Sequence, residues 1–124
     1  MKYLLDVNML IAAVWTDHVH HSRVNAWLEN KDLATCPFSE LGFLRVSTHP
    51  KPFGADMSTA RFLLKDLIRK RSMAFIPADV PALKSKASQN AGLTDLYLAE
   101  LADSHGCKLA SLDTGITHRA VEMI

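Results

Sequence analysis

The sequence predicts an α/β fold with a central, mostly parallel sheet of four or five strands flanked by helices. Short apolar runs, typical of buried strands, alternate along the chain with longer segments whose apolar residues recur at helical spacing. The 124 residues suit one domain, 1–124, and contain no repeat or low-complexity linker. Strands that alternate with helices favour a parallel sheet covered on both faces.

The predicted strands are four short apolar segments and a weaker one at the end of the chain. They are residues 2–5, 33–36, 73–76, 109–112 and 121–124. Because every crossover between parallel strands needs a connecting segment, usually a helix, we expect the helices to lie between them.

The predicted helices are residues 8–15, 18–30, 37–46, 58–70, 80–87 and 94–105. Pro37 suits a helix start, and Ser39 is a candidate N-cap. Thr94 is the expected cap of the last helix, which Gly106 ends. The expected core residues of helix 58–70 are Phe62, Leu64, Leu67 and Ile68.

The cysteines and the apolar start of the chain indicate a cytoplasmic protein. Cys36 and Cys107 show no metal-ligand spacing, so we expect buried free thiols in a reducing compartment. The apolar segment 3–15 is interrupted by Asp6 and Asn8 and is shorter than the roughly 20 residues that cross a bilayer. We therefore expect no membrane association.

Four acidic residues should meet at one edge of this sheet. Asp6 follows the first strand directly and Asp113 follows the fourth, while Glu40 and Asp95 lie in the first turns of helices. In a parallel sheet, the carboxyl ends of the strands and the amino ends of the following helices share one edge, where ligands bind. Individually these acids also fit helix-dipole or turn roles, but unrelated surface acids have no reason to gather there.

Carboxylates gathered at one edge repel one another, and a hard cation relieves that repulsion. Mg²⁺ prefers oxygen ligands, keeps several waters and bridges to phosphates. Two such ions can activate a water and stabilise the leaving oxygen of a phosphodiester. We therefore expect the four acids to be catalytic metal ligands, with Asp6 the best candidate to be shared between two ions.

Two further residues are candidates for supporting roles. Asn8 is either the N-cap of the helix that follows or a hydrogen-bond partner of Asp6 or of a metal-bound water. Arg45, about one turn beyond Glu40, is a candidate contact for phosphate or a neighbouring acid. A basic stripe on helix 58–70 fits a solvated face or a track for an RNA backbone, and the net charge of +1 leaves both open. Its members are Arg61, Lys65 and Arg69.

Three segments resemble the motifs of PIN domains. LLDVNMLIAAVW resembles the opening motif, SELGFLR the helix with the second acid, and GLTDLYLAELADSHGCKLASLD the paired third and fourth acid motifs. The resemblance spans residues 3–119 and is strongest to the compact VapC-like toxins of bacterial toxin–antitoxin pairs. It implies a PIN-like fold, an endoribonuclease that requires Mg²⁺ or Mn²⁺, homodimerisation and inhibition by a cognate antitoxin. The family's acidic quartet corresponds to Asp6, Glu40, Asp95 and Asp113.

One departure from the family pattern leaves the number of ions open. Some relatives carry a further acid shortly after the fourth, where this chain has Thr114, Gly115 and Ile116.

Two other functions remain open at this stage. The first is a non-catalytic PIN-like module that binds RNA or protein. The second is a phosphoacceptor domain or aspartate-based phosphatase, which also places an Asp after its first strand. That reading needs a second acid where Asn8 stands and a well-placed Asp after the third strand, where Pro77 and Ala78 precede Asp79.

Overall fold

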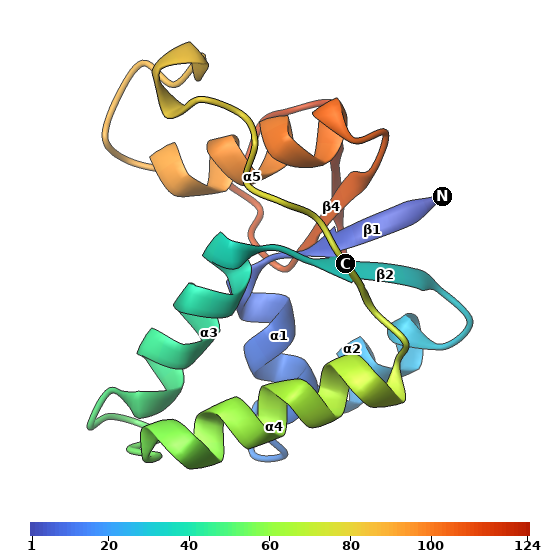
Figure 1. The fold of residues 1–124 in the computed structure, drawn as a ribbon, viewed down its shortest axis with the longest axis vertical. Coiled ribbons are helices and arrows are strands. Elements are labelled where there is room, and N and C mark those ends of the chain that lie inside the picture. Colours follow the sequence, from blue (N-terminus) through green and yellow to red (C-terminus); the bar gives the residue numbers. More distant parts are fainter.

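All five strands run parallel, in the spatial order β3-β2-β1-β4-β5 (Figure 1). This computed structural model describes residues 1–124. The strands are β1 (Lys2–Leu5), β2 (Asp32–Thr35), β3 (Ala74–Phe75), β4 (Lys108–Ser111) and β5 (Val121–Met123). The helices are α1 (Val7–Val14), α2 (His21–Leu28), α3 (Pro37–Thr48), α4 (Met57–Lys70) and α5 (Leu93–Ser104), with a short 3₁₀ turn at Ala82–Lys84. The predicted parallel sheet is thus confirmed.

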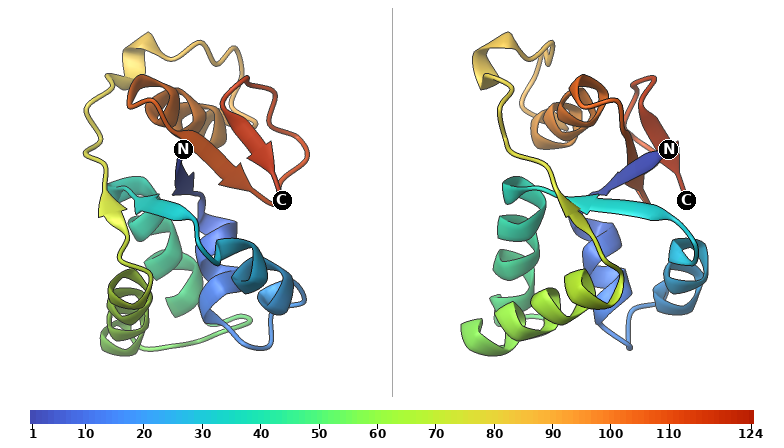
Figure 2. Two further views of the ribbon diagram at one scale, coloured as in Figure 1. Left: turned by 90° about the vertical axis from the view of Figure 1, so that its right-hand side faces the viewer. Right: turned by 45° about the vertical axis from the view of Figure 1, so that its right-hand side comes forward.

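The helices cover both faces of the sheet unequally. Helices α1 to α4 lie on one side and α5 on the other (Figure 2). Side chains of a strand alternate between the two faces, so neighbouring residues enter different cores. Leu5 packs with Leu33 and Phe43 on the α1–α4 side, whereas Leu4 packs with Leu109 on the α5 side. The central strand β1 therefore contributes to both cores.

Three features of the predicted helices are wrong. The segment 80–87 forms only the 3₁₀ turn, because Pro81 precedes it and Leu83 is fully exposed, so no apolar face anchors a longer helix. The helix expected from residue 18 begins at His21. Phe62, expected in the core, is 67% exposed because it lies about 200° around α4 from the buried Ala60.

The remaining expectations for α4 and for the thiols are confirmed. Leu64 and Leu67 are buried, and Ile68 packs against the same core. Cys36 and Cys107 are buried and free. None of the helices combines the length and the apolar character needed to cross a bilayer.

Helices α1 and α3 make a close contact that depends on a glycine. A Cβ atom on Gly42 would lie 2.2 Å from Cγ2 of Val7, which is far inside van der Waals contact. Glycine weakens a helix by about 1 kcal/mol relative to alanine. A glycine at position 42 therefore indicates that the close approach of α3 to α1 outweighs the loss of helix propensity. The contact holds the first turn of α1 against the second turn of α3.

We expect Gly42→Ala to lower the free energy of unfolding by about 1–3 kcal/mol, because the added methyl overpacks the contact with Val7. Urea unfolding measures this loss. In a Val7→Ala background the same substitution should cost less or become stabilising, because the clashing methyl groups are gone. An equal cost in both backgrounds would show that the contact does not limit the approach of the two helices.

Candidate active site

Asp6 is fixed where β1 ends and α1 begins. Its backbone N–H donates to the carbonyl oxygen of Ala110 on β4, at 3.2 Å. Its Oδ1 accepts from the backbone N–H of Met9 at 2.9 Å, so Asp6 is the N-cap of α1. Its Oδ2 accepts from the hydroxyl of Ser111, and only 3% of the residue is exposed. The backbone bond therefore fixes the position of Asp6, and the two side-chain bonds set the direction of its carboxylate.

Asn8 is therefore not the cap of α1, and that interpretation is wrong. It is exposed in the first turn and makes no side-chain hydrogen bond, including none to Asp6. A role beside a water of the site stays a prediction.

Ser111, at the end of β4, connects two of the acids. Its hydroxyl donates to Asp6 and accepts from the backbone N–H of Asp113 at 2.9 Å. Asp113 is itself held by a turn, in which its Oδ1 accepts from the N–H of Gly115 at 2.7 Å. Sequence reasoning missed Ser111. The available signal was a small hydroxyl residue on the last position of a buried strand, two residues before an acid.

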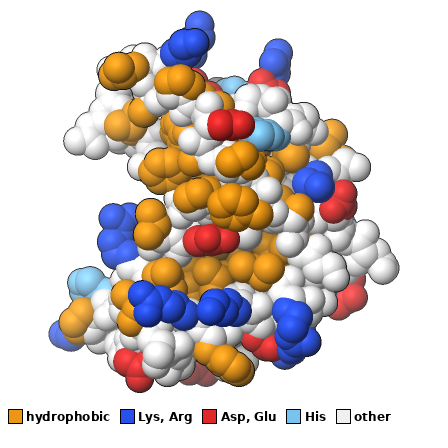
Figure 3. Space-filling view, in the orientation of Figure 1, with side chains coloured by type: hydrophobic (Ala, Val, Ile, Leu, Met, Phe, Trp, Pro, Cys, Tyr) orange, Lys and Arg blue, Asp and Glu red, His pale blue; other side chains and the backbone are white.

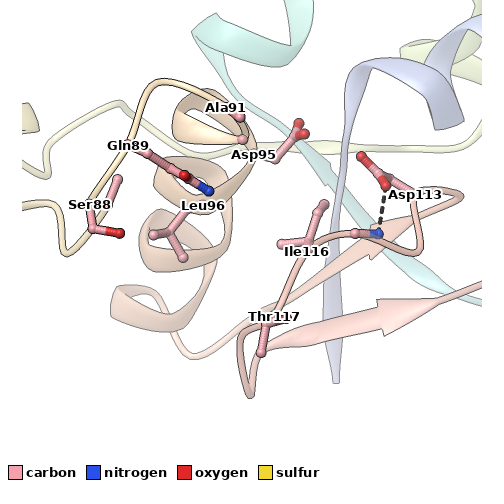
Figure 4. A pocket seen from close by; sticks show the side chains of 11 residues that line it. Ser88, Gln89, Ala91, Asp95, Leu96, Asp113, Ile116 and Thr117 are labelled. Atoms are coloured by element: carbon pink, nitrogen blue, oxygen red, sulfur yellow. Dashed lines mark hydrogen bonds between the residues drawn. The ribbon is translucent and has the colours of Figure 1, made fainter.

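Asp95 reaches the same edge from the other side of the sheet. It lies in the first turn of α5, whose N-cap is Gly92 in the left-handed region (φ 75°), so the expected cap Thr94 is wrong. A residue with a Cβ adopts this conformation less readily than glycine does. Asp95 is half-buried, points toward Asp113, and lines a cavity with it (Figure 4).

The negative charges of neighbouring acids help to raise the pKa values of Asp6 and Asp95. Burial raises the pKa of Asp6 to about 6; the hydrogen bonds from Ser111 and Met9 oppose the rise, and the charges of Asp95 and Asp113 add to it. Burial also raises the pKa of Asp95, with a further contribution from the charge of Asp113. The site thus combines several carboxylates with partial burial, which disfavours their ionised forms.

Glu40 is held close to this group by the start of α3. The N-cap of α3 is Cys36, so the predicted cap Ser39 is wrong; instead, the buried Ser39 hydroxyl donates to the carbonyl oxygen of Leu5 at 2.7 Å. This bond fastens the first turn of α3 to the residue before Asp6. Glu40 is half-buried, and this burial raises its pKa.

Thr35, the last residue of β2, lies close to Glu40 and carries a hydroxyl group without a hydrogen-bond partner. The residue is 1% exposed, and its Oγ1 has no hydrogen-bond partner. It is near enough to Glu40 to oppose the rise in the glutamate's pKa, but outside the geometry of a formed hydrogen bond. A buried polar atom without a partner is unusual, and this one belongs to the edge of the sheet where the acids gather.

The four predicted acids are therefore not equally placed. The charges of Asp95 and Asp113 contribute to the raised pKa of Asp6, and that of Asp113 to the raised pKa of Asp95, whereas the charge of Glu40 contributes to neither. No three carboxylate, imidazole or thiol side chains stand close enough to enclose an ion as they are placed. Arg45 is exposed and forms no ion pair, so its contact with phosphate or an acid stays a prediction.

A cavity of about 380 Å³ opens beside Asp95 and Asp113. Its walls are the loop before α5, the first turn of α5 and the loop that follows β4 (Figure 4). On the larger scale, the molecule is hollowed between the part that contains α5 and the part that contains α3 and α4 (Figure 3). Apolar and acidic side chains occupy the hollow, and basic side chains border it on the α4 side.

We expect Asp6→Asn to stabilise the metal-free protein in a pH-dependent way. Between pH 4 and 6 the unfolded carboxyl of Asp6 loses its proton while the folded one keeps it, so ionisation destabilises the wild-type protein as the pH rises. The stability gained by the variant should grow over this range and level off above pH 6, with a ceiling of about 3 kcal/mol.

Urea unfolding in EDTA from pH 4 to 8 measures this difference. The asparagine oxygen can still accept from Met9, and its amide can donate to the Ser111 hydroxyl, which reverses the direction of that bond but keeps position 6 bonded on both sides. If the variant were less stable than the wild-type protein at pH 8, the conclusion that the buried, ionised carboxylate of Asp6 destabilises the metal-free fold would be wrong.

Comparisons with known proteins agree with this arrangement. The family model of the PIN domain matches residues 3–122. Ribonuclease VapC38 of Mycobacterium tuberculosis is 38% identical over 121 residues, which are 91% of this chain and 86% of that protein. Ribonuclease VapC29 of the same species is 36% identical over 126 residues, 95% and 90% of the two chains.

Two solved structures share the fold. One contains VapBC2 from Rickettsia felis bound to a promoter DNA fragment, with a TM-score of 0.64, 14% identity and coverage of 93% and 90%. The other contains FitAB bound to the IR36 DNA fragment, with a TM-score of 0.63, 20% identity and coverage of 91% and 86%. With the family model and the two ribonucleases, these findings establish that the chain belongs to the PIN-domain family.

Proposed function

We propose that this protein is a metal-dependent endoribonuclease and the toxin of a VapBC-type toxin–antitoxin pair. The observation that carries the proposal is the approach of Asp6, Asp95 and Asp113 at the carboxyl edge of β1 and β4. The similarity to VapC ribonucleases over nearly the whole chain supports the same activity.

The residues at this edge fit a hard divalent cation, Mg²⁺ or Mn²⁺. The four acids and Ser111 offer only carboxylate and hydroxyl oxygens, the ligand atoms that such ions prefer. The raised pKa values of Asp6 and Asp95 indicate that the site lacks positive charge. In this proposal Asp6, Asp95 and Asp113 hold the ion, and Glu40 completes the set from α3. When bound, such an ion lowers the pKa of water and neutralises charge that develops on a phosphodiester.

The protein's own residues prepare this site. Ser111 keeps Asp6 and the backbone of Asp113 at a fixed separation, and the α1 N-cap bond fixes the second oxygen of Asp6. Such outer partners orient ligands and tune their affinity. Because Asp6 is buried and bonded on both oxygens, it needs little rearrangement when a cation arrives.

Basic residues on α4 are suited to hold the RNA backbone. Arg61 and Lys65 are exposed and have no acidic partner, whereas Arg69 and Lys70 both pair with Asp66, at 2.7 and 2.8 Å. The first two are therefore available for phosphate contacts. Basic side chains on the α4 side border the hollow in Figure 3.

A protein antitoxin is the expected partner. One of the similar solved structures contains VapBC2 and the other FitAB, each bound to DNA. We propose that a cognate antitoxin inhibits this protein in the cytoplasm, and homodimerisation remains part of the proposal. The phosphoacceptor alternative gains no support, because Asp79 pairs with His105 at 2.8 Å instead of lying with the acids.

The purified protein should cleave single-stranded RNA in Mg²⁺ or Mn²⁺, and Asp6→Asn and Asp113→Asn should each lower the rate by more than about 100-fold. Loss of a direct ligand should exceed the roughly 10–100-fold effect of losing an outer partner. Gel or mass-spectrometric mapping of the products measures this. Asp103→Asn is the matched control, because that carboxylate binds Arg119 away from the site. Full cleavage in excess EDTA would contradict metal dependence, and RNA binding without cleavage would favour a non-catalytic module.

Thr35→Val should separate the hydroxyl's role at the site from any role in folding. Removing an unpaired buried hydroxyl should leave metal-free stability unchanged or raise it by about 1 kcal/mol. Metal affinity should fall by roughly 10-fold, because Glu40 loses the hydroxyl that can orient it. Melting temperatures across a Mn²⁺ titration give both quantities, and Thr35→Ser should restore the affinity. A variant that loses metal-free stability but keeps its response to Mn²⁺ would assign Thr35 to folding alone.

A further inference from the structure

The cavity beside Asp95 and Asp113 is not needed to hold an ion. The two acids lie at one end of it, and Asp95 points away from Gln89 and Leu96 and toward Asp113 (Figure 4). The rest of the cavity, formed by residues 87–89, 91–92, 96 and 115–117, extends from the acids along the start of α5. A substrate whose phosphate lies at the acids therefore has the rest of this cavity of about 380 Å³ next to it.

The charges of the lining exclude a phosphate as the occupant of that space. No Lys, Arg or His lines the cavity, and its only charged residues are the two acids. A second anionic group would lie beside these carboxylates with no basic side chain to compensate. Of the parts of an RNA substrate, the neutral base and ribose are therefore the ones that suit this space.

The remaining side chains suit the edge and faces of a nucleobase. Gln89 offers an amide with two donors and an acceptor, and Ser88 and Thr117 offer hydroxyls. Leu96 and Ile116 supply apolar surface, and Gly92 brings bare backbone to the wall, where a Cβ would meet nothing within 4 Å. Such a mixture of apolar surface and a few convergent polar groups is typical of small-molecule sites of this volume.

We propose that this cavity takes one unstacked base of single-stranded RNA, adjacent to the phosphodiester that is cut, and that Gln89 reads the edge of that base. This inference rests on the proposed ribonuclease function and adds a determinant of its sequence preference. Single-stranded RNA is recognised in general by splayed bases that are hydrogen-bonded on their edges. The cavity would thus select where the protein cuts, while the acids carry out the cut.

Cleavage of a randomised single-stranded RNA pool in Mn²⁺ tests the proposal. Wild-type cut sites should be enriched in one base at a fixed position beside the scissile bond. Gln89→Ala should reduce this preference by about 5-fold or more, since base-edge hydrogen bonds contribute about 1–3 kcal/mol of discrimination. Asn90→Ala is the matched control, because Asn90 is a neighbouring exposed amide that does not line the cavity. Ala91→Phe should fill the space, raise KM and abolish the preference with little change in kcat.

A binding measurement separates a base from the sugar and phosphate. Fluorescence anisotropy with Asp6→Asn protein, which should not cleave, compares a short RNA containing the preferred base with the same RNA made abasic at that position. The abasic RNA should bind at least about 5-fold more weakly, and Gln89→Ala in the same background should remove most of this difference.

The outcomes distinguish this inference from the proposed function. A wild-type protein without metal-dependent cleavage overturns both. A wild-type protein that cleaves without base preference, or with a preference that Gln89→Ala and Ala91→Phe leave intact, overturns only the base site. Equal binding of the abasic RNA also overturns it, as does an effect of Asn90→Ala as large as that of Gln89→Ala.

Discussion

The burial of one carboxylate, Asp6, at the end of the central strand is the constraint on which the site depends. The strand β1 lies between β2 and β4. Asp6 follows Leu4 by two residues and therefore points to the same face of the sheet, where Leu4 packs among apolar side chains. Placing an aspartate there raises its pKa to about 6. The fold compensates in part by giving both carboxylate oxygens a hydrogen bond. Because these bonds do not fully offset the burial, a cation bound beside the Asp6 carboxylate would stabilise its ionised form.

The surrounding elements are arranged around that carboxylate by short, specific contacts. Gly42 lets α3 approach α1, and Ser39 fastens the start of α3 to the end of β1. Ser111 does the same for β4 and the backbone of Asp113. The acid site therefore has a rigid half, built on β1 and β4, and a second half that arrives on the first turns of α3 and α5. The unpaired Thr35 hydroxyl lies close to Glu40, which belongs to the second half.

The order and direction of the elements could be predicted from the sequence, and with them the edge at which the acids lie. This followed because strand periodicity and helical spacing are local properties, and a parallel sheet puts all its strand ends on one side. The connecting hydroxyls could not be predicted, since Ser39 and Ser111 act on residues 34 and 105 positions away. The same limit explains the misplaced cap Ser39, whose hydroxyl bonds to Leu5 instead of to its own helix. Whether a polar residue caps its own helix or bonds across the fold is decided by tertiary packing.

Anomalous diffraction from crystals soaked in Mn²⁺ would locate the cation. We expect an anomalous peak at ligand distance from a carboxylate oxygen of Asp6, with Asp95 or Asp113 as a second ligand. A fully occupied Mn²⁺ elsewhere on the protein, with no density between these three acids, would contradict it.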